Sequence, residues 1–239
     1  MCIFDGTTPC HIRTLGPSDI HEVTPLVDMF LQIAREEKWQ PGDALGAYCD
    51  GSAYVGLYLA DTPVGGIQMV LPSSRGVWWP SRDIWPECEP VGRSDVGHVM
   101  IMGLRKEYRG HKELFWRMCA QLWRTCIERG ITEVWLEATP STLRVYRRIG
   151  FPLEVIGSCR LHWNEPCVLC RMTIEGVRSG HGKVVDVAVL PVARKHGAWY
   201  IRCYQGRKKI ELLANYRGAI FRSILLGCKG AELDALGAS

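Results

Sequence analysis

The sequence predicts an α/β protein built on a mixed sheet, in which most neighbouring strands are antiparallel and one pair is parallel. Two apolar, β-rich runs, residues 53–59 and 64–71, flank Asp61-Thr62-Pro63, which is typical of a hairpin. Residues 96–156 then alternate in the order strand, helix, strand, helix, strand. That order implies a right-handed crossover onto a parallel pair of strands within the sheet.

The N-terminal part begins with one short strand and one amphipathic helix. Residues 11–13 have strand character, and Pro17-Ser18-Asp19 is a helix-start signal. Apolar residues then recur at helical spacing, at Ile20, Val23, Leu26, Val27, Phe30 and Ile33. After the hairpin, residues 72–92 are rich in Pro, Trp and Arg, so we expect a long surface loop that covers a binding cleft. Its tryptophans, Trp78, Trp79 and Trp85, either line an acyl or amine pocket or anchor the loop on the core.

The central elements are the best defined. Residues 96–104 form a nearly continuous apolar run of strand length, which residues 105–110 end. A helix is predicted after residue 110, with Gly130 as its C-cap. The apolar residues that share one face of this helix are Leu114, Met118, Leu122 and Cys126. Further elements are expected as a strand at 131–138, a helix at 141–149 and a last strand at 160–174 with Asn164-Glu165-Pro166 at its turn.

Charge divides the chain near residue 175. Residues 176–239 hold 11 of the 29 Lys and Arg but only 4 of the 25 Asp and Glu. We therefore predict a domain at 1–175 and a basic C-terminal extension at 176–239, with strands at 183–190 and 199–204 and a helix or strand pair at 210–226. The extension would add to the sheet, form a dimer arm or contact phosphate through its basic residues. Nucleic-acid binding is not expected, because it needs aromatic side chains along a basic groove and the periodicity of the sequence does not establish such a groove.

Composition bounds the class of protein. With 239 residues, of which 47% are hydrophobic, the chain can bury a sizeable core. We expect neither a membrane span, since no run approaches about 18 apolar residues, nor export, since the first residues lack a signal-peptide pattern. Eleven irregularly spaced cysteines favour reduced thiols and a cytoplasmic location. Oligomeric state stays open.

A strand that runs into a helix through a basic, glycine-containing turn creates an anion site, because the first N–H groups of the helix lack partners. The segment Arg109-Gly110-His111-Lys112-Glu113-Leu114 occupies that place. A pyrophosphate or a phosphopantetheine phosphate would suit it. The surrounding basic residues would attract an acidic carrier protein or form a solvated helix face; they are Arg105, Lys106, Arg109, Lys112, Arg117, Arg147 and Arg148.

The chain resembles the GNAT (GCN5-related) acyltransferase superfamily over residues 11–174. The best-matching segments are 104–110, a strand end followed by Arg and Gly, and 146–151, a Tyr before Gly-Phe. Within the superfamily the chain is most similar to the autoinducer (acyl-homoserine-lactone) synthases and the N-acyl amino acid synthases, through Trp39, the strand at 64–72 and Thr139-Pro140. It departs from the pattern in having Lys112 and Leu114 where small residues are usual, and in lacking Glu-x-Ser-Arg, whose place residues 98–101 hold.

The resemblance implies a GNAT-like fold and a donor site. The strand at Met102, Gly103 and Leu104 would bulge away from the strand at 135–137 and open a V, in which a pantetheine arm pairs like an extra strand. The phosphate end would meet Arg109, Gly110, His111, Lys112, Glu113 and Leu114. Tyr146 matches the residue that protonates the departing thiolate, although it would equally serve as a helix-packing residue.

The general base that would take the proton from the amine is predicted from residue type and position, not from the resemblance. His98 lies on the strand expected to line the cleft, and the ordinary pKa of histidine, near 6.5, suits a general base. The alternative is a buried histidine in a structural role. Glu137 and Asp95 are the further candidates. No metal site is expected, because Cys167 and Cys170 lie in a strand-like run, where alternate side chains diverge.

The sequence therefore predicts an N-acyltransferase that moves an acyl group from a phosphopantetheine thioester, on acyl-CoA or acyl carrier protein, to the primary amine of a small amino-acid-like acceptor. Direct transfer is expected, since no cysteine has a paired base. One alternative is an acetyl-CoA-dependent acetyltransferase acting on a protein or antibiotic amine. Another is an inactive GNAT scaffold that serves as a binding module. Acyl length, carrier and acceptor are not fixed by the sequence.

Overall fold

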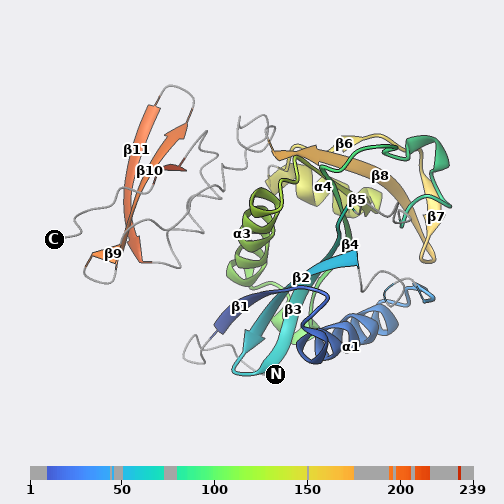
Figure 1. Cartoon of the computed structure of the whole chain (residues 1–239), viewed down its shortest axis with the longest axis horizontal. Helices are drawn as coiled ribbons and strands as arrows, with labels where there is room; N and C mark the ends of the chain where they lie inside the picture. The colour runs from blue at the N-terminus through green and yellow to red at the C-terminus, as the bar shows by residue number, and fades with distance from the viewer. Residues whose placement is uncertain are drawn as a thin grey trace.

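The computed structural model describes residues 10–43, 45, 51–72, 80–149 and 151–174, and the strand backbones at 194–195, 198–205, 208–215 and 231–232. The main body is one twisted sheet in the order β1-β2-β3-β4-β5-β8-β6, with β7 paired to β8 (Figure 1). Its strands are β1 (Cys10–Leu15), β2 (Ser52–Leu59), β3 (Thr62–Val70), β4 (Val96–Leu104), β5 (Glu133–Ala138), β6 (Glu154–Val155), β7 (Arg160–His162) and β8 (Glu165–Thr173).

Helices connect these strands and cover the sheet. They are α1 (Ile20–Glu36), α3 (Lys112–Glu128) and α4 (Pro140–Ile149), with short 3-10 turns at Pro86–Cys88 and Lys106–Tyr108. Every strand pair in the sheet is antiparallel except β4 with β5, which α3 joins as a parallel crossover. The mixed sheet and its parallel pair confirm the predicted fold class. No helix among the described residues is long and apolar enough to cross a membrane.

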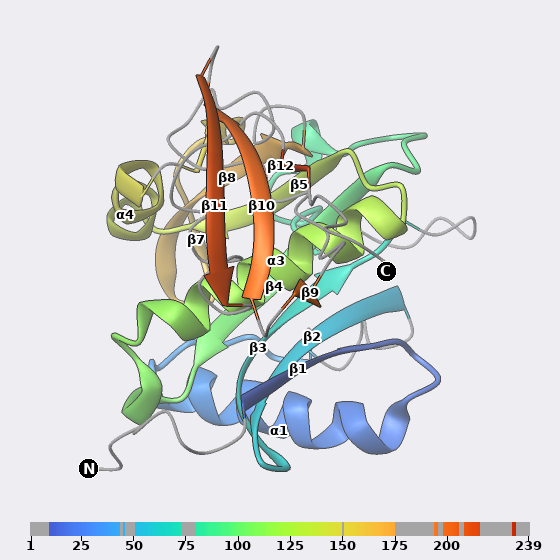
Figure 2. The ribbon, with the colours of Figure 1, turned by 90° about the vertical axis from the view of Figure 1, so that its left-hand side faces the viewer.

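The two largest hydrophobic clusters among the described residues lie on opposite faces of the sheet, because alternate residues of a strand point to opposite faces. On β2, Tyr54 packs with Leu26 and Phe30 of α1. Its neighbour Val55 lies in the other core, with Leu114 and other residues of α3. Figure 2 shows α1 and α3 on either side of the strands. The four α3 residues predicted to share one face are all buried: Leu114, Met118, Leu122 and Cys126.

Gly66 sets how closely α1 approaches the sheet. A Cβ at this position would lie 2.7 Å from the backbone oxygen of Val55 and 3.0 Å from Cδ1 of Leu26. We expect Gly66→Ala to lower the free energy of unfolding by about 1–3 kcal/mol, because backbone has to move to admit the methyl group. Gly16→Ala is the control, since its nearest contact would be 3.9 Å away. Chemical denaturation measures both, and equal effects of the two substitutions would contradict the argument.

The structure corrects the expectation of a single strand at residues 160–174. The segment is a hairpin of β7 and β8, and its turn holds two positive-φ residues, Trp163 (48°) and Asn164 (69°). Asparagine tolerates that conformation, and two consecutive residues in it make the tight turn whose twist matches a hairpin. The turn therefore lies between the strands at Trp163 and Asn164, one residue earlier than the sequence indicated.

Trp85 settles one of the alternatives for the loop before β4. Its side chain is 1% exposed, and its indole N–H donates to the backbone oxygen of Ser158 over 2.7 Å. It thus anchors the loop on the core. Trp78 and Trp79 lie outside the described residues.

The C-terminal strands form their own antiparallel sheet. It contains β9 (Arg194–Lys195), β10 (Ala198–Gln205), β11 (Lys208–Asn215) and β12 (Ala231–Glu232). The strand expected at 199–204 is confirmed by β10, and β11 covers the first residues of the segment at 210–226. The strand expected at 183–190 and the domain boundary at 175/176 lie outside the described residues. None of these four strands pairs with the main sheet in the part that is described.

Candidate active site

The parallel pair of β4 and β5 is joined over only part of its length. Cα partners run from Val96 opposite Glu133 to Val99 opposite Leu136 and stop there. Beyond that point β4 continues to Leu104, with its other edge still paired to β3. The two strands therefore diverge, which is the V that the resemblance implies.

A β-bulge marks the point of divergence. Val99 lies opposite Met69 and Ile101 lies opposite Gln68, so Met100 is an extra residue on β4. A bulge bends a strand and increases its local twist. It thus turns the end of β4 away from β5 after their last shared pair.

A cavity of about 260 Å³ occupies the V. Its walls come from β4, β5, α3, α4 and the β7–β8 turn. They include residues of both cores: Leu122 and Leu136 belong to the α3 side, and Met100 and Ile101 to the α1 side. The cavity therefore passes between the strands from one face of the sheet to the other. Of the predicted donor residues, Met102 is among those that line it.

Glu137 is one of two carboxylates in the wall of this cavity, with Glu165. Its side chain lines the wall and is 9% exposed. Both carboxylate oxygens lie close to Nε2 of His98, at 2.9 and 3.0 Å. The Nδ1 atom of His162 is 3.9 Å from Oε1 of Glu137. His98 is fully buried and, unlike Glu137 and His162, is not among the residues that line the cavity.

Burial and charge act in opposite directions on this cluster. Burial raises the pKa of Glu137, but the charge of His98, its hydrogen bond and the charge of His162 outweigh burial, so the net shift is downward. Burial lowers the pKa of His162, Glu137 raises it and His98 lowers it further, and the net shift is again downward. Near neutral pH the cavity wall therefore presents an ionised carboxylate beside a neutral imidazole.

Tyr146, the predicted proton donor, is one of the cavity-lining residues. It lies on α4, lines the cavity and packs between two aromatic rings, at centroid distances of 6.4 Å to Phe115 and 5.6 Å to Phe151. Burial raises its pKa, so the phenol stays protonated and can donate a hydrogen bond. The helix-packing and the donor interpretations are thus compatible.

The turn before α3, where the sequence predicts an anion site, has open space beside Gly110, and its arginine has acidic partners. Gly110 has φ +92°, and a Cβ there would meet nothing within 4 Å. The Arg109 guanidinium forms ion pairs with Glu37 and Glu36 at the end of α1, and its Nε donates to the oxygen of Leu104. Leu114 is fully buried in the α3 core, so this bulky residue does not obstruct the turn.

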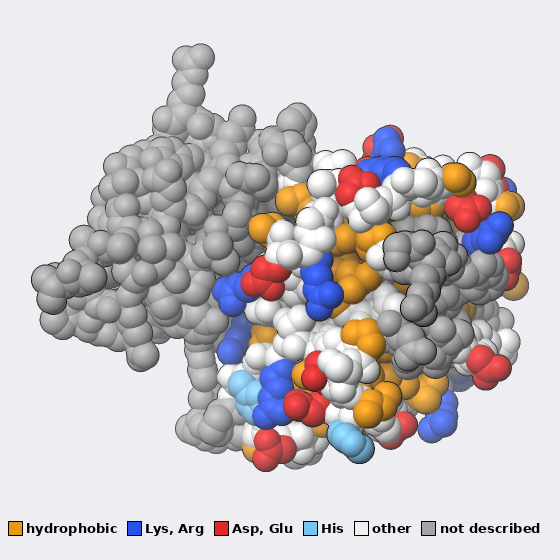
Figure 3. Space-filling model, in the orientation of Figure 1, with side chains coloured by type: hydrophobic (Ala, Val, Ile, Leu, Met, Phe, Trp, Pro, Cys, Tyr) orange, Lys and Arg blue, Asp and Glu red, His pale blue; other side chains and the backbone are white. Residues whose placement is uncertain are grey.

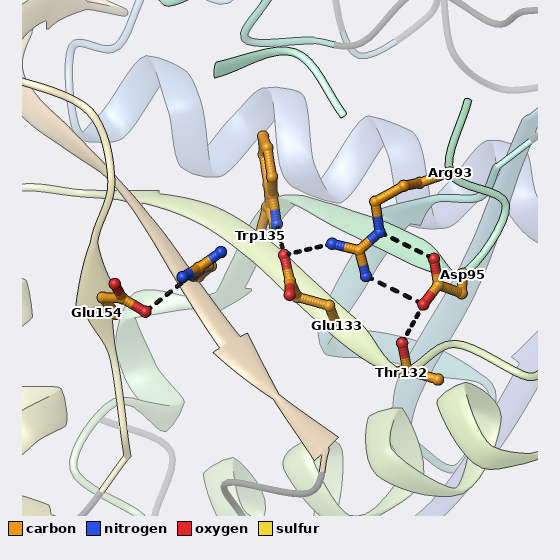
Figure 4. A network of polar contacts seen from close by, with 7 residues as sticks. Arg93, Asp95, Thr132, Glu133, Trp135 and Glu154 are labelled. Atoms are coloured by element: carbon orange, nitrogen blue, oxygen red, sulfur yellow. Dashed lines mark hydrogen bonds and ion pairs between the residues drawn. The ribbon is translucent and has the colours of Figure 1, made fainter. Parts of the chain in front are cut away.

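Asp95 belongs to a different network, at the closed end of the parallel pair (Figure 4). Its carboxylate accepts two bonds of 3.0 Å from Arg93 and one from the hydroxyl of Thr132. Arg93 also lies 3.2 Å from Glu133 at the start of β5. The hydrogen bonds from Arg93 and Thr132 lower the pKa of Asp95 to about 2. Asp95 does not line the cavity, and its contacts tie the start of β4 to the start of β5.

The wall residues that the β7–β8 hairpin supplies at its turn were not identified from the sequence as part of the site: His162, Trp163 and Glu165. Glu165 accepts a hydrogen bond of 3.0 Å from the indole of Trp39, which links the hairpin to the segment after α1. The ring centroids of Trp39 and Trp163 are 6.3 Å apart, and both residues line the cavity. The available sequence signal was Asn164, a residue type that favours turns, directly after Trp163. The prediction of one strand over 160–174 left these residues out of the site.

The cysteines of the C-x-x-C sequence are divided between two places. Cys167 lines the cavity, whereas Cys170 is fully buried in the α3 core. Burial raises the pKa of Cys167 to about 12 and that of Cys170 to about 11. Among the described residues no group of three or more His, Cys, Asp or Glu could hold a metal ion.

The surface of the described part carries hydrophobic side chains near the middle of the face shown in Figure 3, with charged side chains among them.

The sequence matches no protein-family model and no curated protein. Solved structures do match the fold. FeeM, an N-acyl amino acid synthase from uncultured soil microbes, superposes with a TM-score of 0.58 at 13% identity, over 73% of this chain and 95% of FeeM. The acyl-homoserine lactone (AHL) synthase LasI superposes with a TM-score of 0.55 at 13% identity, over 70% of this chain and 90% of LasI.

A third match is BjaI, a CoA-dependent acyl-homoserine lactone synthase solved with SAM and isopentyl-CoA. Its TM-score is 0.52 at 17% identity, over 69% of this chain and 83% of BjaI. At such identities the likeness concerns the arrangement of the backbone. Together with the diverging β4–β5 pair, it shows that the main body of this chain, with its mixed sheet and flanking helices, has the fold of the GNAT acyltransferases.

Proposed function

We propose that the protein is an N-acyltransferase that moves an acyl group from a phosphopantetheine thioester to the primary amine of a small, amino-acid-like acceptor. The observation that carries the proposal is the cavity between the diverging ends of β4 and β5, which has the Glu137 carboxylate in its wall. The matched structures of an N-acyl amino acid synthase and of AHL synthases support the same reaction class.

The donor would enter the V as an added strand. Met102, Gly103 and Leu104 lie in the part of β4 that β5 does not pair, so their backbone groups on that edge are available to the amides of a pantetheine arm. The phosphate end would lie at the amides that begin α3, near Gly110, His111, Lys112 and Glu113, where the open space beside Gly110 admits it. Arg109 would reach it by exchanging an acidic partner.

The largely apolar wall of the cavity favours acyl groups longer than acetyl. Residues from both faces of the sheet line it, and Trp39 and Trp163 on the α1 side are among them. An acetyl group has little apolar surface to bury there. A longer acyl chain would gain about 0.8 kcal/mol of binding free energy for each CH₂ group that it buries.

The reaction needs a neutral amine, donors for the oxyanion and a proton for the departing thiolate. Glu137, which contacts the buried His98, belongs to the cavity wall and would face the attacking amine. Backbone N–H groups of β4 would stabilise the oxyanion. Tyr146, protonated and in the wall, would donate to the sulfur.

The test is release of free thiol from acyl-CoA of increasing chain length and from acyl carrier protein, with a panel of amino acids and small amines. We expect thiol release that depends on both substrates, and an amide product identified by its mass. Long acyl donors should outcompete acetyl-CoA. The opposite ranking would favour the acetyltransferase, and neither turnover nor thioester binding with any donor would refute the proposal.

Tyr146→Phe keeps the ring and removes the hydroxyl. We expect kcat to fall by roughly tenfold, because a thiolate leaves readily without full protonation, having an ordinary pKa of about 8.5. Donor KM should change little, since the aromatic contacts with Phe115 and Phe151 remain. Steady-state kinetics measure both constants. If kcat were the same in the variant, Tyr146 would have only its packing role.

A further inference from the structure

We propose that His162 is the residue that takes the proton from the acceptor amine, and that His98 is a positioning residue that acts through Glu137. The inference deepens the proposed function and rests on it. It assigns the base to a residue of the β7–β8 hairpin rather than to the strand that opens the V.

Access to the cavity separates the two histidines. A general base has to come within about 2.6–3.2 Å of the proton that it removes. His98 has no exposed surface and is not among the wall residues, so a bound amine does not reach its ring without rearrangement. His162 lines the wall and its side chain is 12% exposed.

The Glu137 carboxylate lies close to both rings. It holds Nε2 of His98 at 2.9 Å and faces Nδ1 of His162 at 3.9 Å. A carboxylate beside Nδ1 fixes the tautomer in which Nε2 carries the lone pair, as in carboxylate–histidine pairs that serve as bases. The distance of 3.9 Å is longer than a hydrogen bond, and such contacts commonly tighten once substrate binds.

The charges around His162 suit this role. Glu137 faces it from β5 and His98 lies behind that carboxylate on β4. Trp85 and Trp163 pack against its ring at 6.0 and 5.2 Å, and the other nearby carboxylate, Glu165, accepts from Trp39. Burial keeps the imidazole neutral at pH 7, and the adjacent Glu137 stabilises the imidazolium once it forms. Glu137 itself, with a lowered pKa, is a weaker proton acceptor.

The proton and electron pairs balance as follows. The lone pair of the neutral amine forms the C–N bond at the thioester carbonyl, and the surplus proton on nitrogen passes to Nε2 of His162. The C–S bond then breaks and its electron pair leaves with sulfur. The thiolate is protonated, and His162 loses its proton to return to the neutral form. The products are an amide and a thiol.

The experiment compares His162→Gln, His162→Asn and His98→Gln with the exposed-site control His21→Gln on α1. We expect both His162 variants to lose about 100-fold in kcat while thioester binding, measured by calorimetry, is unchanged. They should lose the acidic limb of the pH profile of kcat/KM and regain activity with added imidazole. His98→Gln should keep the limb and not respond to imidazole. His21→Gln should match the wild type.

The outcomes separate this inference from the proposed function. If the wild type turns over and the His162 variants keep its kcat and acidic limb, the inference is wrong and the function stands. The inference is also overturned if imidazole rescues His98→Gln instead. If the wild type releases no thiol with any donor, both fall together. Circular dichroism of each variant checks the fold, and imidazole rescue separates a missing base from a damaged structure.

Discussion

Glu137→Ala is expected to abolish acyl transfer and to lower the free energy of unfolding by about 1–3 kcal/mol at pH 7. The substitution removes the carboxylate that two imidazoles face, at 2.9 Å for His98 and 3.9 Å for His162. A buried polar group that loses its partner costs about 1–3 kcal/mol, and here the fully buried ring of His98 loses its contact with the carboxylate. Denaturant unfolding and thiol release measure the two effects.

The pH dependence gives a second test of the same group. In the folded protein the pKa of Glu137 lies below its ordinary value of 4.5. A lowered folded-state pKa contributes stability that is fully present above the unfolded value and is lost as the pH falls through the folded value. The stability difference between the wild type and Glu137→Gln should therefore be largest above about pH 4.5 and shrink below it.

Glu133→Gln is the matched control on the same strand. Glu133 is 5% exposed and lies 3.2 Å from Arg93, but it does not line the cavity. Its loss should lower stability and leave transfer unchanged. If Glu137→Ala retained wild-type turnover, the placement of the chemistry in this cavity would be wrong.

Most of the fold was predictable because local patterns determine it. The apolar run of β4, the helical period of α3 and the crossover order each depend on residues close in sequence, and the structure confirms them. The bulge at Met100 was not visible, since an extra apolar residue in an apolar run changes no pattern. It is defined only by the register with β3.

The site was predictable only in part, because its contacts join distant segments. His98 and Glu137 were identified singly, but their pairing depends on the β4–β5 register. His162 was missed since it ends β7, and the hairpin that forms β7 was not predicted. Likewise, the ion pair of Arg109 with Glu37 spans 72 residues and draws a predicted phosphate ligand toward α1.

Deleting Met100 is expected to abolish thioester binding while the protein still folds. Met100 is the one residue of β4 that β3 does not match, between the pairs Val99–Met69 and Ile101–Gln68. Without it those pairs follow each other directly, so every later residue of β4 keeps its partner and its face. The strand loses the bend that a bulge imposes.

A straight β4 would continue to pair with β5 beyond Val99–Leu136 and close the V. New strand pairing offsets the loss of the buried Met100 side chain, so we expect a moderate loss of stability and at least a 100-fold loss of acyl-CoA affinity, equivalent to about 2.8 kcal/mol. Calorimetry with acyl-CoA and thermal unfolding measure these. Met100→Leu conserves volume and keeps the bulge, and should bind like the wild type. A deletion variant that binds acyl-CoA normally would show that the donor does not need the diverging strands.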